Sequence, residues 1–277
     1  MSWLADILAS KQREIASLRA VPREGSGRCG HRPLDVVAAL RRGDGLRLIA
    51  EVKLRSPSAG ALSRTLSPRD RAVVYARTGA AVVSVLCDGP FFDGGWGDLA
   101  ACRAALDEAG LRVPLLAKEF VLDRRQVEEA RDRGADAVLL IARIVDAPSL
   151  ARLASAAREE GIEPLVEVVD EDELRAALDA GARVIGVNAR DLDSLEIDLP
   201  RAARLLGAIP MEIVAVHMSG LKTPADVAQV AALAHEAGPG ARPADAALIG
   251  EALMRRDDPT ALLGKFVFAA RPAPPRP

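Results

Sequence analysis

The sequence has few of the residues on which disulfide-rich and metal-binding proteins depend. Its 277 residues include only three cysteines, Cys29, Cys87 and Cys102, and three histidines. The cysteines have no CxxC spacing and no nearby histidine pair, which argues against a disulfide framework and against a structural zinc site. This cysteine usage is typical of a reducing compartment, and we expect a cytoplasmic protein.

Long apolar runs and an excess of charge of one sign are also missing. The formal net charge is −2, with 37 basic and 39 acidic residues, so the composition predicts no nucleic-acid partner and no membrane partner. The N-terminal stretch MSWLADILASKQREIASLRA carries acids and bases at helical spacing, which predicts a helix and not a signal peptide. Aromatic residues are scarce at 3%, but 49% of the residues are apolar, enough for a sizeable core.

What the sequence does have is a repeated alternation of apolar runs and amphipathic segments. Segments such as DRRQVEEARDRG and DEDELRAALDAG show apolar residues at helical spacing. Several of them end in Gly-Ala or a close relative just before an apolar run, as in RTGAAVVSVL and DRGADAVLLI, where glycine suits a helix C-cap. The apolar runs are predicted strands, and they cover residues 46–53, 80–86, 113–120, 136–142, 163–169, 183–188, 212–218 and 245–250.

Eight such units within about 230 residues predict a (β/α)8 TIM barrel, an α/β fold, with an additional N-terminal helix. A doubly wound open sheet is the main rival, but no Gly-x-Gly-x-x-Gly follows the first predicted strand. No linker divides the chain, so we expect a single domain over residues 1–265. Residues 266–277, which include ARPAPPRP, are expected to form a Pro-rich tail.

Polar residues collect at the predicted carboxyl ends of the strands, where barrel enzymes place their active sites. Since side chains alternate along a strand, Glu51 and Lys53 share a face. Any one such residue is most often part of a rim salt bridge, but acids and lysines together at one mouth are the groups that acid–base catalysis uses. The strand ends contribute Glu51, Lys53, Lys118, Glu167, Asn188, Arg190, Met218 and Ser219.

A second signal follows the last two predicted strands. SGLKTP comes after the seventh strand, and GEALM opens a helix after the eighth. Small residues let backbone N–H groups approach an anion, and a helix N-terminus adds partial positive charge. Each glycine alone is more often a simple turn residue, but the pair matches the place where many barrels bind phosphate.

At these residues the chain resembles the indole-3-glycerol phosphate synthase family of tryptophan biosynthesis. The resemblance runs from the N-terminal helix to about Met254, and its most specific blocks are IAEVKLRSPSAG (49–60) and IGVNARDLDSLEIDL (185–199). It implies a carboxy-lyase that uses no cofactor and no metal. Such an enzyme would close the ring of 1-(2-carboxyphenylamino)-1-deoxyribulose 5-phosphate, with loss of carbon dioxide and water, to give indole-3-glycerol phosphate.

The resemblance also implies roles for individual residues. Lys118 would be the general acid at the carbonyl oxygen, Glu167 the acid/base of the later steps, and Lys53 the cation that handles the carboxylate and the leaving hydroxyl. Glu51 and Asn188 would orient these groups. Further substrate contacts are expected at Ser56, Pro57, Phe92, Phe120, Arg190 and Met218, and phosphate contacts at Ser219, Gly220, Gly250 and Glu251. For Arg190, bracing of the rim is an equally good interpretation.

One position departs from the family pattern. The family's seventh strand normally ends in Glu-Ser-Gly-Ile, whereas this chain reads Met218-Ser219-Gly220-Leu221, so the inward carboxylate is missing. His217 is adjacent, but strand alternation points it away from the mouth.

Three interpretations therefore stay open. The chain is a working synthase that tolerates the methionine, a diverged paralogue that acts on a related N-aryl ketose phosphate in a specialised pathway, or a non-catalytic protein that binds a phosphorylated ligand. An enzyme is favoured over a phosphate binder, because a phosphate binder has no need of Lys53, Lys118, Glu167 and Asn188. In each case we expect a phosphorylated small molecule as the partner, and a monomer.

Overall fold

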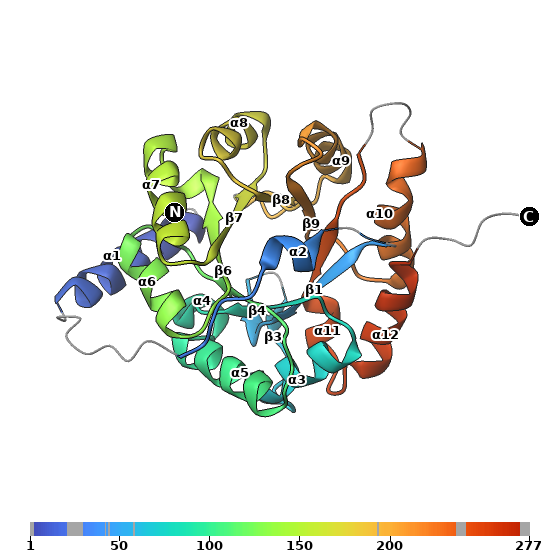
Figure 1. Ribbon diagram of the computed structural model, residues 1–277, viewed down its shortest axis with the longest axis horizontal. Helices are drawn as coiled ribbons and strands as arrows, with labels where there is room; N and C mark the ends of the chain where they lie inside the picture. Colours follow the sequence, from blue (N-terminus) through green and yellow to red (C-terminus); the bar gives the residue numbers. More distant parts are fainter. Residues whose placement is uncertain are drawn as a thin grey trace, which may run out of the picture.

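The computed structural model describes residues 3–20, 30–41, 43, 45–57, 59–192, 194–236 and 242–271. Its centre is a closed barrel of eight parallel strands with helices around it (Figure 1). In chain order these strands are β1 (Arg47–Val52), β4 (Val82–Leu86), β5 (Leu115–Lys118), β6 (Ala137–Ile141), β7 (Glu163–Val168), β8 (Val184–Asn188), β9 (Val214–Met218) and β10 (Ala246–Ile249). Each pairs with its neighbours in chain order, and β1 closes the ring by pairing with both β4 and β10. The predicted (β/α)8 fold and all eight predicted strands are confirmed.

Helices and two short strands precede, connect and follow the barrel strands. A two-stranded hairpin, β2 (Arg55–Ser56) with β3 (Gly60–Ala61), follows β1. The helices are α1 (Trp3–Ala20), α2 (Val36–Leu40), α3 (Pro68–Thr78), α4 (Gly89–Phe92), α5 (Trp96–Glu108), α6 (Arg124–Asp132), the 3-10 turn η1 (Ala142–Ile144), α7 (Ala147–Glu159), α8 (Glu171–Asp179), α9 (Leu199–Ala208), α10 (Pro224–Glu236), α11 (Glu251–Met254) and α12 (Thr260–Ala269).

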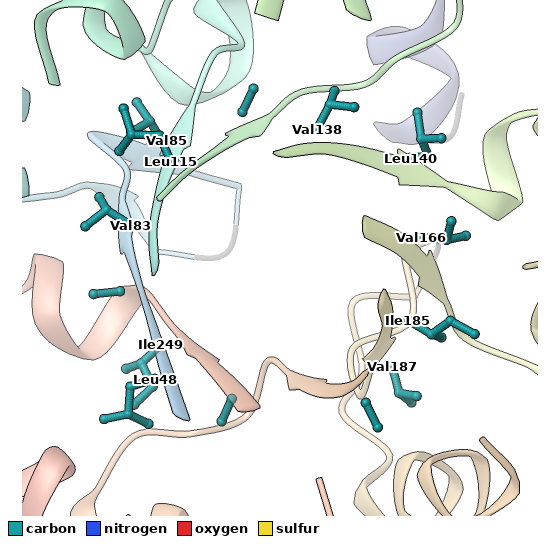
Figure 2. Close-up of a cluster of buried hydrophobic side chains, with 14 of the residues drawn as sticks. Leu48, Val83, Val85, Leu115, Val138, Leu140, Val166, Ile185, Val187 and Ile249 are labelled. Carbon is teal, nitrogen blue, oxygen red and sulfur yellow. The ribbon is translucent and has the colours of Figure 1, made fainter. Parts of the chain in front are cut away.

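The strands are apolar on both faces because they separate two cores. Side chains such as Val83, Leu140 and Val187 point outward from the ring, toward the surrounding helices (Figure 2). Side chains such as Ile49 and Leu165 belong to the second cluster, inside the barrel. Burial on both sides explains the continuous apolar runs in the sequence. It also leaves the strand ends as the place where polar side chains can gather.

Three of the predicted helix-ending glycines have the expected backbone. Gly79, Gly134 and Gly181 have φ angles of 107°, 86° and 69°, all in the left-handed region. In each case the chain turns directly into the next barrel strand. The Gly-Ala signal therefore marks the start of a βα unit correctly.

The two ends of the barrel are covered by different N-terminal helices. α2 lies across the centre of the ring in Figure 1, and its Val36 and Leu40 belong to the interior cluster. The expected N-terminal helix is α1, whose Leu4 and Ile7 are buried in the same cluster. Its Trp3 contacts Phe92, which follows strand β4. α1 therefore reaches the carboxyl ends of the strands.

The predicted start of the C-terminal tail is too early. α12 continues through residue 265 to Ala269, and Phe266 within it is fully buried. The carbonyl oxygen of Ala270 accepts a hydrogen bond of 2.9 Å from the backbone N–H of Leu46. The first residues assigned to the tail are thus packed on the barrel, while residues 272–277 lie outside the described part. Within that part, no helix combines the length and the apolar character that a membrane span requires.

Candidate active site

A cavity of about 800 Å³ opens at the carboxyl ends of the barrel strands. Its wall includes every site residue that the sequence predicts. These are Glu51, Lys53, Ser56, Pro57, Phe92, Lys118, Phe120, Glu167, Asn188, Arg190, Met218, Ser219, Gly220, Gly250 and Glu251. The strands β1, β5, β7, β8 and β9 each contribute, so residues distant in sequence meet because parallel strands end at one rim.

The first polar group of the cavity is the pair of Glu51 and Lys53. Glu51 is on β1 and Lys53 follows it directly, and Nζ of Lys53 lies 2.6 Å from Oε1 of Glu51. The carboxylate side chain is 2% exposed and the ammonium side chain 15%. Gly250, at the end of β10, makes room for this carboxylate, since a Cβ at Gly250 would lie 2.4 Å from Oε1.

The second group is a chain of polar contacts across three strands. Nζ of Lys118 on β5 lies 3.3 Å from Oε2 of Glu167 on β7. Asn188 on β8 donates from Nδ2 to Oε1 of Glu167 at 2.9 Å, and its own Oδ1 accepts from the backbone N–H of Arg190 at 3.0 Å. Both oxygens of the buried carboxylate therefore have partners, and the amide of Asn188 is fixed at both ends. A carboxylate held this way can exchange a proton without changing position.

Arg190 belongs to the cavity wall and also braces the rim. Its guanidinium donates to the carbonyl oxygen of Leu195 at 3.0 Å. A backbone bridge joins Arg190 to Ile197. Arg190 thus braces the rim, and its contact with the substrate stays a prediction.

Met218 occupies the inward position at the end of β9. It lies in register with Asn188 on β8 and Leu248 on β10, and it is 2% exposed. The adjacent His217 is absent from the cavity wall, as strand alternation predicts. Burial lowers the pKa of His217, which favours the neutral imidazole. Its Nε2 donates to the carbonyl oxygen of Ser219 at 3.0 Å.

The turn after β9 has an unusual backbone. Ser219 and Gly220 have consecutive positive φ angles, 69° and 83°. A serine in the left-handed region is disfavoured by contact of its Cβ with the backbone, and the hydrogen bond from His217 helps to hold it there. This turn faces α11, whose first N–H groups have no acceptor within the helix.

Three cations that sequence reasoning did not assign line the same end of the cavity. They are Lys222, Arg255 and Arg256. Arg255 pairs with Glu251 at 2.8 Å, while the side chains of Lys222 and Arg256 are exposed. Their place in the sequence indicates this location, because they follow the two glycine turns closely, in SGLK and ALMRR. Cations and small residues together make this end suited to a phosphate.

The opposite end of the cavity is apolar and aromatic. The ring of Trp3 meets the rings of Phe92 and Phe120 edge-on, with centroids 6.4 Å away in both cases, and the two phenylalanine rings are 6.0 Å apart. Leu139 and Ile141 of β6 complete this surface. Leu139 and Ile141 are two positions apart on β6, so strand alternation alone predicts that both side chains face the same side. A flat aromatic group fits such a surface.

Within the described residues, no group of three or more His, Cys, Asp or Glu side chains has the arrangement of a metal site. The central polar side chains of the cavity wall are paired with each other, as lysine with glutamate and asparagine with glutamate. Fold and cavity together define a (β/α)8-barrel protein of the acid–base enzyme class, with one aromatic and one cationic end to its cavity.

Comparison with known proteins narrows this class. The family profile described as "Indole-3-glycerol phosphate synthase" matches residues 4–266. The chain is 45% identical over 235 residues to indole-3-glycerol phosphate synthase 1 of Streptomyces coelicolor, covering 85% of this chain and 82% of that protein. It is 40% identical over 280 residues to indole-3-glycerol phosphate synthase of Beutenbergia cavernae, covering 99% and 98%. The chain belongs to the indole-3-glycerol phosphate synthase family.

Solved structures are similar at the level of the fold. 3-Hexulose-6-phosphate synthase from Salmonella typhimurium superposes with a TM-score of 0.61 at 16% identity, covering 81% of this chain and 98% of that chain. Thiamine phosphate pyrophosphorylase from Pyrococcus furiosus gives 0.58 at 16% identity, covering 82% and 96%. These likenesses concern the barrel alone.

Proposed function

We propose that this chain is a carboxy-lyase that converts 1-(2-carboxyphenylamino)-1-deoxyribulose 5-phosphate to indole-3-glycerol phosphate, carbon dioxide and water. The observation that carries the proposal is the joint arrangement of Lys53, Lys118 and Glu167 in one cavity between an aromatic end and a cationic end. The substrate has the matching order of groups: an aryl ring, a reacting carbonyl and a phosphate.

Lys118 is the proposed general acid of the first step. The aryl carbon that bears the carboxylate attacks the ketone, and the carbonyl oxygen takes a proton from Nζ as the new carbon–carbon bond forms. Glu167, 3.3 Å from this ammonium, holds it in position before the transfer. Positioned proton donors of this kind contribute on the order of 100- to 10,000-fold to a rate.

Carbon dioxide then leaves, and dehydration completes the indole. Lys53 is the proposed partner of the substrate carboxylate and, after decarboxylation, the donor to the departing hydroxyl. As the hydroxyl leaves, Glu167 accepts a proton from the ring methylene carbon next to the nitrogen, so the carbon–carbon double bond of the indole forms and the ring nitrogen keeps its hydrogen. Glu51, 2.6 Å from Lys53, and Asn188, 2.9 Å from Glu167, keep these two groups in place.

The substrate's two ends have separate proposed contacts. Phe92, Phe120 and Pro57 pack the aryl ring, with Ser56, Arg190 and Met218 on the surrounding wall. The phosphate is proposed to bind at Ser219, Gly220, Gly250 and Glu251, through backbone N–H groups and the Ser219 hydroxyl.

We further propose that the protein acts as a monomer in the cytoplasm. Every residue of the proposed site comes from one chain, so catalysis needs no second copy. Cys87 and Cys102 are buried free thiols, which suits a reducing compartment. Sedimentation equilibrium tests the monomer, and a dimer at micromolar concentration would contradict it.

Turnover tests the function directly. Purified protein is mixed with the anilino-ribulose phosphate while indole fluorescence and carbon dioxide release are followed. We expect both products in equal amounts, and a loss of about 100-fold or more in kcat for Lys118→Met. Lys265→Gln, an exposed lysine of α12 outside the cavity, is the control for a lost charge. Binding without indole and carbon dioxide would refute the proposal.

A further inference from the structure

Lys11 is a buried cation that the acid–base steps do not use. It lies in α1, and its side chain is 1% exposed. Its Nζ lies 2.9 Å from Oδ1 of Asp88, 2.9 Å from Oε1 of Glu119 and 2.8 Å from Oε2 of Glu14. Lysine is almost never fully buried without a partner. Here, two of the three partners come from separate loops at the mouth of the barrel.

Both of these carboxylates also fix the backbone of an aromatic residue. Asp88 caps α4, where its Oδ2 accepts from the N–H groups of Phe91 at 2.7 Å and Phe92 at 3.2 Å. Glu119 accepts from the N–H of Phe120 at 2.7 Å through Oε1, the same oxygen that faces Lys11. Asp88 therefore links Lys11 to the backbone of Phe92, and Glu119 links Lys11 to the backbone of Phe120.

The same helix places its first ring against these two side chains. Trp3 and Lys11 are eight positions apart, about two helical turns, and so lie on one side of α1. The Trp3 ring contacts both phenylalanine rings edge-on. α1 is thus attached to the aromatic end of the cavity at two points, one apolar and one ionic.

We propose that Lys11 is a positioning residue for the aryl group of the substrate, because its pairing with Asp88 and Glu119 sets the positions of Phe92 and Phe120 and holds Trp3 against them. The identity of that aryl group rests on the proposed function above. Lys11 touches no reacting atom, so its effect belongs to binding.

The electrostatics of the cluster support this role. Burial raises the pKa of Glu119 to about 7, even though Lys11 acts in the opposite direction. Burial opposes the charge of Lys11 as well, but Glu119, Glu14 and Asp88 outweigh it and raise its pKa. Without the ammonium, two buried carboxylates would face each other with no cation between them. They would take up protons or admit water, and either change loosens the loops that carry the phenylalanines.

Kinetics of Lys11→Met test the proposal. We expect KM to rise about tenfold while kcat changes by less than about threefold. The bound substrate and the transition state would lose the same amount of binding energy, and the reacting groups would stay in place. Lys11→Arg keeps the charge and should restore most of the KM. Arg13→Met is the matched control, since Arg13 is an exposed cation of the same helix. A KM for Lys11→Met equal to that of Arg13→Met, or a loss confined to kcat, overturns the proposal.

A second readout requires no substrate. The sequence has two tryptophans, so Trp96→Phe leaves Trp3 as the only one. In that background we expect Lys11→Met to make Trp3 fluorescence more easily quenched by acrylamide, and Arg13→Met to leave it unchanged. Equal quenching in all variants overturns the proposal. Since this result does not depend on turnover, it separates a failure of Lys11 as a positioning residue from a failure of the proposed function.

Asp88→Asn provides an independent variant in case Lys11→Met does not fold. The asparagine oxygen can still accept from the two N–H groups at the start of α4, so the helix cap is kept. Its amide donates where the carboxylate accepted, so the contact with Lys11 is lost. We expect the same direction of change, a higher KM and a more accessible Trp3. Parameters equal to the wild type would refute the link through Asp88.

Discussion

The thioether of Met218 lies in the space that Gly186 leaves open inside the barrel. A Cβ at Gly186 would be 2.4 Å from Sδ of Met218, closer than side-chain atoms approach. The next nearest atom to that Cβ belongs to Leu165, at 3.0 Å. The end of the methionine side chain therefore points down into the apolar interior between β7 and β9. It adds no polar group to the mouth, where Glu51 and Glu167 are the carboxylates that pair with the lysines.

Met218→Glu should increase kcat and decrease stability. A carboxylate cannot stay in the apolar space over Gly186, so it would turn toward the mouth and become a third acid/base group beside the two lysines. We expect kcat to rise by about threefold or more, with a decrease of a few degrees in Tm because an acid replaces a buried thioether. Met218→Gln is the control, with similar size and no ionisation. A gain in kcat that is the same for Gln and Glu would rule out a role for the charge.

Gly250→Ala should separate Glu51 from Lys53. The new Cβ would lie 2.4 Å from Oε1 of Glu51 and 3.2 Å from its Cβ, so the carboxylate has to move. We expect kcat to fall about tenfold and the free energy of unfolding to fall by about 1–3 kcal/mol. Urea unfolding and initial rates measure the two effects.

Gly264→Ala is the matched control for that substitution. Gly264 is an exposed residue within α12, and nothing lies within 4 Å of the point that a Cβ there would occupy. Alanine there should leave kcat unchanged and stabilise the helix by about 0.5–1 kcal/mol. If Gly250→Ala behaves like Gly264→Ala, the close approach of Glu51 to the backbone has no effect on the site.

Glu119→Gln should change how stability depends on pH. Burial raises the pKa of Glu119 from 4.5 to about 7, with Lys11 acting against this shift. The folded protein therefore binds more protons than the unfolded chain between these values. The contribution of Glu119 is complete below pH 4.5 and is lost as pH rises through 7. Glutamine does not titrate, so the variant should lack this decrease, which we expect to be about 1–3 kcal/mol.

Urea unfolding of both proteins at pH 5, 6, 7 and 8 measures this difference. Other groups that titrate in the same range, His217 among them, are common to both proteins and cancel in the comparison. The charged neighbours Lys11, Glu14 and Asp88 are retained as well. Parallel curves for the two proteins would show that Glu119 has the same proton affinity in the folded and unfolded states.

Local patterns in the sequence were sufficient for the barrel and for the cavity wall. The eight strands are apolar runs between helical segments, and strand alternation placed Glu51, Lys53 and Met218 inward. The register of a parallel barrel then brings the strand ends together without further information. The predicted start of the C-terminal tail, at residue 266, was too early. The prediction followed the Pro-rich composition of the chain end and not the apolar residues around Phe266, which belong to α12.

The ionic cluster around Lys11 could not be predicted in this way. In the sequence, Lys11 is one of several charged residues in a helix with helical spacing, a pattern that normally marks a solvent-exposed face. Its burial depends on how α1 crosses the loops that carry Asp88 and Glu119. That crossing is a tertiary relation between distant segments, and no periodicity in any one of them encodes it.

Lys222→Gln and Arg256→Gln should weaken substrate binding through charge. Both side chains are exposed cations on the cavity wall, at the end where we propose that the phosphate binds, so they would attract the phosphate dianion. We expect KM to rise about three- to tenfold for each, with kcat nearly unchanged, since neither reaches the reacting carbonyl.

Attraction between exposed charges is screened by salt. The fall of kcat/KM with added salt should therefore be shallower in the double variant. Lys265→Gln, which removes one positive charge outside the cavity wall, should keep the wild-type salt dependence. An unchanged slope in the double variant would mean that the backbone turns after β9 and β10 bind the phosphate without help from these cations.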